Sequence, residues 1–130
     1  MLRGFLAALT IYKGTIEDCT PPRSLGTVID SGIYPKNPVA GDISYLWVNF
    51  YLSKQVYSGS VTYSTTWNYI PMEPFTEDLC KQMICPVYSG IYNVSGNTTF
   101  PEIHGLVEVT TQWADSDNTP IWCVKTTYNL

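Results

Sequence analysis

Short segments in which apolar and polar residues alternate recur along most of the chain, whereas continuous helical periodicity is hard to find. Alternation with a period of two is typical of strands with one buried face. The clearest segments cover residues 27–34, 43–52, 106–113 and 121–128, with a longer extended region at 56–69. Their number and spacing predict an all-β domain, a sandwich of about seven strands.

The alternation also predicts which side chains face the interior. In the 43–52 segment, the aliphatic and phenyl face should point inward, and it holds Leu46, Val48, Phe50 and Leu52. In the 106–113 segment the inward face holds Val107, Val109, Thr111 and Trp113, so Glu108 points to solvent. In the 56–69 region we expect one face to meet the core, namely Val61, Tyr63, Thr65, Trp67 and Tyr69.

Two further segments are predicted to lie outside the central strands. Pro71 and Pro74 interrupt residues 70–75, so this segment is expected at a sheet edge or over an opening. Residues 114–120 are rich in Asp, Ser and Asn and end in Pro120, which predicts a hairpin connection.

The composition fits one compact domain. The chain has 130 residues, of which 45% are hydrophobic and only 14% are charged, and its formal net charge is -4. This acidic balance argues against a general nucleic-acid-binding protein. The hydrophobic content is too high for a disordered chain, and no stretch approaches the roughly 20 consecutive apolar residues that span a bilayer.

The N-terminal segment is open to two interpretations. Arg3 precedes a short apolar run at residues 5–9, but no clear small-residue cleavage site follows. Residues 1–15 are therefore either the remnant of a signal segment or part of a leading strand over 9–16. Residues 16–130 form the predicted domain.

Cysteines and glycosylation sequons indicate the compartment. Cys19, Cys80, Cys85 and Cys123 form an even set that allows three disulfide connectivities in an exported chain. Two N-glycosylation sequons, at Asn93 and Asn97, lie close together in a polar stretch that we expect to form one exposed turn. Together these features favour an oxidising compartment.

Candidate catalytic and metal-binding residues are few. His104 is the only histidine and no nucleophile-elbow pattern accompanies it, so we expect an exposed loop residue rather than a catalytic base. Glu73, Glu77 and Asp78 cluster, but acidic loops on a net-negative protein are usually solvated. The 115–118 turn lacks the glycine and glutamate of a calcium loop, and the cysteines do not form zinc knuckles. We therefore expect no enzyme, no metal and no cofactor.

The cysteines belong to an ordered set of landmarks that spans residues 16–130. The set comprises Cys19, the segment 34–41, Asp78-Leu79-Cys80 through Cys85-Pro86, Phe100-Pro101, and the 106–113 strand leading through an acidic turn to Cys123. This arrangement resembles the ML lipid-recognition family, which includes the Niemann-Pick type C sterol carrier and phosphatidylglycerol/phosphatidylinositol transfer proteins. The resemblance implies an immunoglobulin-like β-sandwich of two antiparallel sheets with an apolar cavity between them. It also implies the disulfides Cys19–Cys123 and Cys80–Cys85, while an additional central disulfide of the family's sterol carriers has no counterpart here.

The resemblance further implies that the inward side chains line a lipid-binding cavity, whereas composition alone favours an interdigitated solid core. The implied lining residues are Leu46, Val48, Phe50, Tyr63, Trp67, Val107, Val109 and Trp113. The implied cavity entrance is formed by Ile70, Met72, Phe75, Phe100 and Pro101.

The family implies a secreted or lumenal protein, of a lysosome or vacuole, that binds one sterol or phospholipid and transfers it between membranes. Its partners would be the lipid, a transiently contacted membrane and a membrane receptor, with no nucleic acid. A second hypothesis is a secreted recognition module that presents a ligand to a partner protein without transfer. The third is a small secreted hydrolase, against which the solitary His104 argues.

Overall fold

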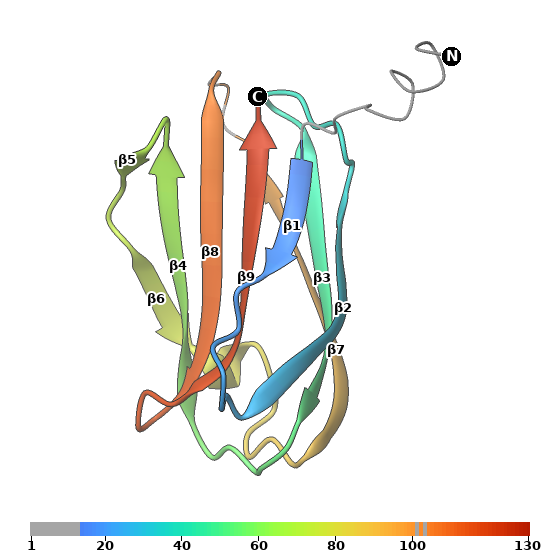
Figure 1. Cartoon of the computed structure of the whole chain (residues 1–130), viewed down its shortest axis with the longest axis vertical. Coiled ribbons are helices and arrows are strands. Elements are labelled where there is room, and N and C mark those ends of the chain that lie inside the picture. The colour runs from blue at the N-terminus through green and yellow to red at the C-terminus, as the bar shows by residue number, and fades with distance from the viewer. Residues whose placement is uncertain (1–13, 101, 103) are drawn as a thin grey trace.

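The computed structural model describes residues 14–100, 102 and 104–130 (Figure 1). This part of the chain forms nine strands and one short 3-10 helix: β1 (Gly14–Asp18), β2 (Gly26–Tyr34), β3 (Ile43–Leu52), β4 (Gly59–Trp67), β5 (Ile70–Pro71), β6 (Phe75–Asp78), the 3-10 helix (Leu79–Lys81), β7 (Gly90–Thr99), β8 (Leu106–Asp115) and β9 (Pro120–Asn129). Within the described ranges, no helix is long and apolar enough to cross a membrane.

The strands form two antiparallel sheets. The larger sheet has the order β1-β9-β8-β4-β5, with β6 also paired to β4, and the smaller has the order β2-β3-β7. Figure 1 shows the larger sheet in front and the smaller one behind it and to the right. This architecture confirms the predicted all-β sandwich.

Most predicted strands are confirmed. Strands β2, β3, β8 and β9 match the segments 27–34, 43–52, 106–113 and 121–128, with ends that differ by at most two residues. The chain has more strands than expected, because β1 and the short strands β5 and β6 also pair. The proline-interrupted segment 70–75 lies at the edge of the larger sheet, as predicted.

Two local predictions are wrong. Tyr69 was expected on the core face, but it is 77% exposed, because Asn68 and Tyr69 adopt left-handed backbone conformations in the tight turn between β4 and β5. The stretch that holds Asn93 and Asn97 is no turn but the middle of β7, which pairs with β3 along its whole length without a register shift. The long neighbouring strand satisfies this backbone and overrides the local turn preference of Asn and Gly.

The N-terminal alternatives fall mainly outside the described residues. The predicted leading strand over 9–16 overlaps β1, which pairs with β9 from Gly14 to Asp18. Residues 1–13, on which the signal-segment interpretation depends, lie outside the described part of the chain.

The buried side chains form two clusters between the sheets. The larger cluster is built around Phe50, Trp113 and Trp122, with ring centroids 5.6 Å apart for Phe50–Trp113 and 4.7 Å apart for Trp113–Trp122. The smaller cluster consists of Ile33, Phe100, Val107 and Tyr128. Phe100 packs edge-on against Tyr128, with centroids 4.5 Å apart.

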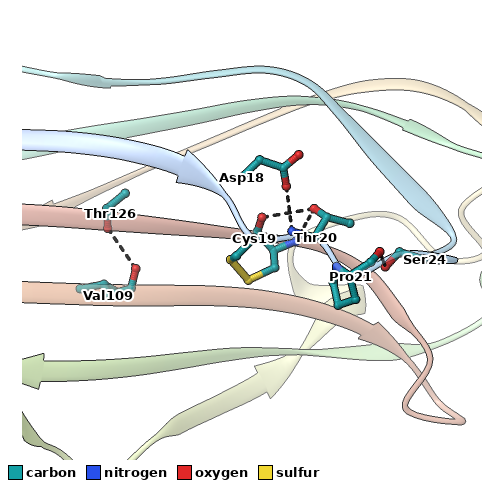
Figure 2. Close-up of a disulfide and its surroundings, with 8 residues drawn as sticks. Asp18, Cys19, Thr20, Pro21, Ser24, Val109 and Thr126 are labelled. Atoms are coloured by element: carbon teal, nitrogen blue, oxygen red, sulfur yellow. Dashed lines mark hydrogen bonds between the residues drawn. A yellow bond between two sulfur atoms is a disulfide. The ribbon is translucent and has the colours of Figure 1, made fainter.

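Two disulfides join Cys19 to Cys123 and Cys80 to Cys85, as the family resemblance implies. Figure 2 shows the first bond, where the chain leaves β1 beside β9. The backbone around it is tied by hydrogen bonds: the Cys19 amide donates to the Cys123 carbonyl at 3.0 Å, and the Cys123 amide donates to the Thr20 hydroxyl at 3.0 Å. This bond fixes the start of the described chain to the last strand.

Candidate functional site

A cavity of about 890 Å³ lies between the two sheets. The smaller sheet contributes side chains from β3 and β7, and the larger sheet contributes side chains from β4, β8 and β9. Most of the lining is apolar, with Leu46, Val48, Val94, Val107, Val109, Trp113 and Trp122 among its residues.

Side-chain size along β8 and β9 explains why the sheets enclose space here. Trp113 faces Trp122 in register, and these large rings fill the space between the sheets. The next inward pairs on the same two strands are Thr111 with Val124 and Val109 with Thr126. Their short β-branched side chains cannot fill a separation of about 10 Å between packed sheets. The cavity therefore begins where the tryptophan pair ends.

Several hydroxyl groups in the lining are paired with protein atoms. Ser44 Oγ and Tyr128 Oη lie 3.2 Å apart across the two sheets, and Thr126 Oγ1 donates to the Val109 carbonyl at 3.2 Å. Hydroxyls that already have a partner present little unsatisfied polarity to a guest molecule. These paired hydroxyls therefore add little polarity to the lining, which is mainly apolar.

Charge is almost absent from the lining. Among the described lining residues none is Lys or Arg, and Glu73 is the one carboxylate. Glu73 and Met72 belong to the connection between β5 and β6, at the edge of the larger sheet. This connection and the edge strand β7 of the smaller sheet border the cavity from opposite sides. We take the gap between these two edges as the mouth.

A tyrosine–glutamate pair holds the larger sheet together beside the mouth. The Tyr63 hydroxyl on β4 donates to Glu77 Oε1 on β6 at 3.0 Å, and Gln82 Nε2 donates to the same oxygen at 2.6 Å. Burial, followed by the hydrogen bond to Glu77 and the negative charge of Glu77, raises the pKa of Tyr63 to about 12. Tyr63 therefore stays neutral to a higher pH than an ordinary tyrosine, and its hydroxyl adds a side-chain link to the backbone pairing of β4 with β6.

Seven of the eight side chains predicted for the cavity lining lie there: Leu46, Val48, Tyr63, Trp67, Val107, Val109 and Trp113. Phe50 does not. It shares the inward face of β3 with Leu46 and Val48, but it lies further along the strand, where it packs against Trp113 and Trp122 in the larger cluster. The alternation indicates which face of the strand is buried. It does not indicate whether side chains of the opposite sheet fill the interior at a given position along the strand.

The five residues predicted for the entrance are divided in the structure. Met72 lines the cavity and is half exposed, whereas Phe100 is buried against Tyr128 and forms part of the interior wall. Ile70 and Phe75 are 62% and 61% exposed and lie outside the lining. Pro101 lies outside the described residues.

Sequence reasoning missed the contribution of β7 to the site. Residues 94–99 line the cavity along this edge strand. Val94 is the one apolar residue in this segment. It lies two residues after Tyr92, whose ring packs against Phe50, so Tyr92 and Val94 share the inward face of β7. Interpreting the sequons as a turn concealed this alternation.

His104 contributes to the fold through its backbone, because its carbonyl accepts a hydrogen bond from Trp67 Nε1 at 3.0 Å. Its side chain is exposed in the loop before β8. Among the described residues, no group of three or more His, Cys, Asp and Glu side chains is placed to hold a metal ion.

Comparison with known proteins places this cavity in a family context. The sequence profile of the ML domain matches residues 14–130. Two proteins of Dictyostelium discoideum, named as candidate phosphatidylglycerol/phosphatidylinositol transfer proteins 1 and 3, are 27% and 28% identical over 119 residues. Each alignment covers 88% of this chain and 79% of the relative.

Two solved structures share the fold. A Niemann-Pick type C2 protein from the Japanese carpenter ant superimposes with a TM-score of 0.69 at 16% identity, covering 88% of this chain and 98% of the other. Chicken MD-1, solved in complex with lipid IVa, superimposes with a TM-score of 0.67 at 14% identity, covering 92% of each chain. These similarities confirm the predicted immunoglobulin-like sandwich. Because the ML profile covers nearly all of the sequence, the chain belongs to the ML domain family.

Proposed function

We propose that this protein binds a single lipid, a sterol or a phospholipid, between its two sheets and transfers it between membranes. The observation that carries this proposal is the cavity of about 890 Å³, which is lined mainly by apolar side chains and bordered by two sheet edges. Its volume lies in the upper part of the range of small-molecule sites, about 300–1,000 Å³.

Relatives and structural neighbours support the ligand class. The Dictyostelium relatives are named for the transfer of phosphatidylglycerol and phosphatidylinositol, and the MD-1 structure holds lipid IVa. A sterol and a phospholipid remain the two candidate ligands for this chain.

Hydrophobic burial supplies the driving force in this proposal. Each square ångström of apolar ligand surface removed from water contributes about 25 cal/mol. The lining has no Lys or Arg among its described residues to bind a phosphate, so selectivity would depend on cavity shape rather than on ionic contacts. The mechanism consists of extraction, sequestration and release, with no covalent step and no cofactor.

The mouth provides the surface for membrane contact. Ile70, Met72 and Phe75 expose more than half of their side-chain surface along the edge of the larger sheet, next to the cavity. Exposed apolar patches beside a groove mark sites of protein or membrane interaction. In this proposal these three residues touch the bilayer while the lipid passes between β7 and the β5–β6 connection, and Phe100 forms part of the inner wall.

The two disulfides support a secreted or lumenal location, since such bonds persist in oxidising compartments. The alternative function is presentation of the lipid to a partner protein, such as a membrane receptor.

Native mass spectrometry with lipid extraction tests the proposal on protein secreted from a eukaryotic host with its disulfides intact. We expect one sterol or phospholipid per chain. A folded protein that is empty and does not take up added sterol or phospholipid would overturn the proposal. Transfer of fluorescent lipid between donor and acceptor vesicles then separates a carrier from a presenting module, because only the carrier accelerates exchange.

A further inference from the structure

The outer face of the smaller sheet carries a row of aromatic rings. Ser44, Leu46 and Val48 on β3 point into the sandwich, so Tyr45, Trp47 and Tyr51 point outward. Tyr45 and Tyr51 are 46% and 44% exposed, and Trp47 is half-buried. Tyr45 and Trp47 are neighbours on this face, and Asn49 separates them from Tyr51. Exposed apolar side chains that gather on one open face mark a candidate interaction site.

Both glycosylation sequons lie on this same face. The register between β3 and β7 is unbroken and places Asn97 opposite Tyr45, and Asn93 opposite Asn49. The Asn93 side-chain amide donates to the Asn49 side-chain oxygen, which shows that this pair faces outward together. Asn97 is two residues further along β7, so its side chain points to the same side. Asn97 also borders the cavity, because β7 is the edge strand beside the mouth.

We propose that an N-linked glycan on Asn97 packs its first sugar over the ring of Tyr45 and covers this end of the aromatic row. Residues directly opposite each other in an antiparallel pair have Cβ atoms about 4.5–5.5 Å apart. The first sugar is attached to the Asn97 amide nitrogen and is therefore delivered beside the tyrosine ring. The C–H groups on one face of a sugar carry partial positive charge and match the negative face of an aromatic ring.

The two sequons have different surroundings. Asn93 is opposite the polar Asn49 and bonded to it, so a glycan at Asn93 has no ring directly across the strand. Trp47 does not take this role, because its indole lies over Gly32 of β2, where an added Cβ would come within 2.5 Å of the ring. Tyr45 is thus the aromatic ring that faces a sequon directly.

A glycan at Asn97 also protects the free edge of the smaller sheet. Strand β7 pairs with β3 on one side and has no strand partner on its other side in the described structure (Figure 1). Such an edge can pair with another chain unless a bulky or charged group obstructs it. The glycan is bulky and strongly hydrated, so it supplies this obstruction near the C-terminal end of the edge strand.

A thermodynamic cycle on the secreted glycoprotein tests the inference, which depends on passage through a glycosylating compartment but not on lipid binding. Site occupancy is first measured by peptide mass spectrometry. Equilibrium unfolding is then compared for the parent, Tyr45→Ala, Asn97→Gln and the double variant. Tyr51→Ala is the matched control, since it removes an equally exposed tyrosine from the same face six residues away.

We expect Asn97 to be occupied and the Tyr45 and Asn97 substitutions to be coupled by about fivefold in the unfolding equilibrium constant. Tyr45→Phe should keep the coupling, because the ring is retained, and Tyr51→Ala should show none with Asn97→Gln. An unoccupied Asn97, or additive effects of Tyr45→Ala and Asn97→Gln, would overturn the inference.

Discussion

The hydroxyl oxygens of Ser44 and Tyr128 lie 3.2 Å apart and connect β3 of one sheet to β9 of the other at the edge of the cavity. Both residues are buried. A buried hydroxyl that loses its partner keeps its desolvation cost, so Tyr128→Phe should reduce stability by about 1–2 kcal/mol. The Ser44→Ala/Tyr128→Phe double variant should cost less than the sum of the single variants in urea unfolding. Simple additivity would show that the pair does not interact.

Filling the cavity should displace the ligand without unfolding the protein. Val109→Trp places a large ring into the hollow region, where free volume reduces the overpacking cost of about 1–3 kcal/mol that a filled core imposes. We expect loss of most bound lipid in native mass spectrometry. The control Thr110→Trp changes the adjacent residue on the outer face of β8 and should retain the lipid. Equal lipid content in both variants would place the ligand elsewhere.

An acidic residue at the mouth should slow lipid transfer between vesicles and leave the amount of lipid bound per chain unchanged. Ile70→Glu adds a charge to an exposed position beside the cavity but outside its lining. A charge at the bilayer surface opposes membrane contact, so exchange between anionic vesicles should slow by about tenfold, which corresponds to about 1.4 kcal/mol in the barrier. Ile29→Glu, at a 55% exposed position on β2, the edge strand of the smaller sheet opposite to β7, is the control and should transfer at the parent rate. If both variants behave alike, the mouth residues do not mediate contact.

The two disulfides should differ in their effect on stability. The Cys19–Cys123 bond joins residues 104 positions apart, and the Cys80–Cys85 bond joins residues only five apart. In the chain-entropy account, the long bridge contributes about 4–5 kcal/mol and the short one about 2 kcal/mol. Guanidinium unfolding of the two paired Cys→Ala variants should show the larger loss for the long bridge. The reverse order would contradict this account.

Stability should fall at high pH as Tyr63 ionises. Its pKa is raised from about 10 in the unfolded chain to about 12 in the folded protein by burial and by Glu77. The neutral form is therefore favoured by folding, and the associated stability is fully present below pH 10 and lost as the pH rises through 12. In an ultraviolet titration, Tyr63→Phe should remove one tyrosinate component near pH 12, and Tyr57→Phe should leave that component in place.

Alternation along the strands predicted which side chains face the interior of the sandwich, but not how far the cavity extends along the strands. Leu46, Val48 and Phe50 share one face of β3, and all three are at least partly buried. Only Leu46 and Val48 border the cavity, because Phe50 meets the large rings of Trp113 and Trp122 on the opposite sheet. Which inward residues meet across the sandwich depends on the register between sheets, and a single-strand pattern does not contain that information.

Local turn chemistry misled the sequence interpretation in two opposite ways. The Asn and Gly residues of 93–97 favour turns, but pairing with the long strand β3 keeps them extended. Asn68 adopts the left-handed conformation that Asn tolerates, and with Tyr69 it reverses the chain between β4 and β5, where the alternation had predicted a continuous strand. At 93–97 strand pairing, a non-local interaction, outweighed the local turn preference, whereas at 68–69 the local turn preference ended the strand.

The stacked pair Trp113–Trp122 also limits how far a guest can penetrate. From Trp122 to Tyr128 on β9 there are six residue steps, or about 20 Å of strand. One leaflet of a bilayer has a hydrocarbon thickness of about 15 Å, half that of the whole core. An extended acyl chain that reaches the bilayer midplane is therefore short enough to fit along β9 between the tryptophan pair and Tyr128. A longer guest must leave its remainder at the protein surface.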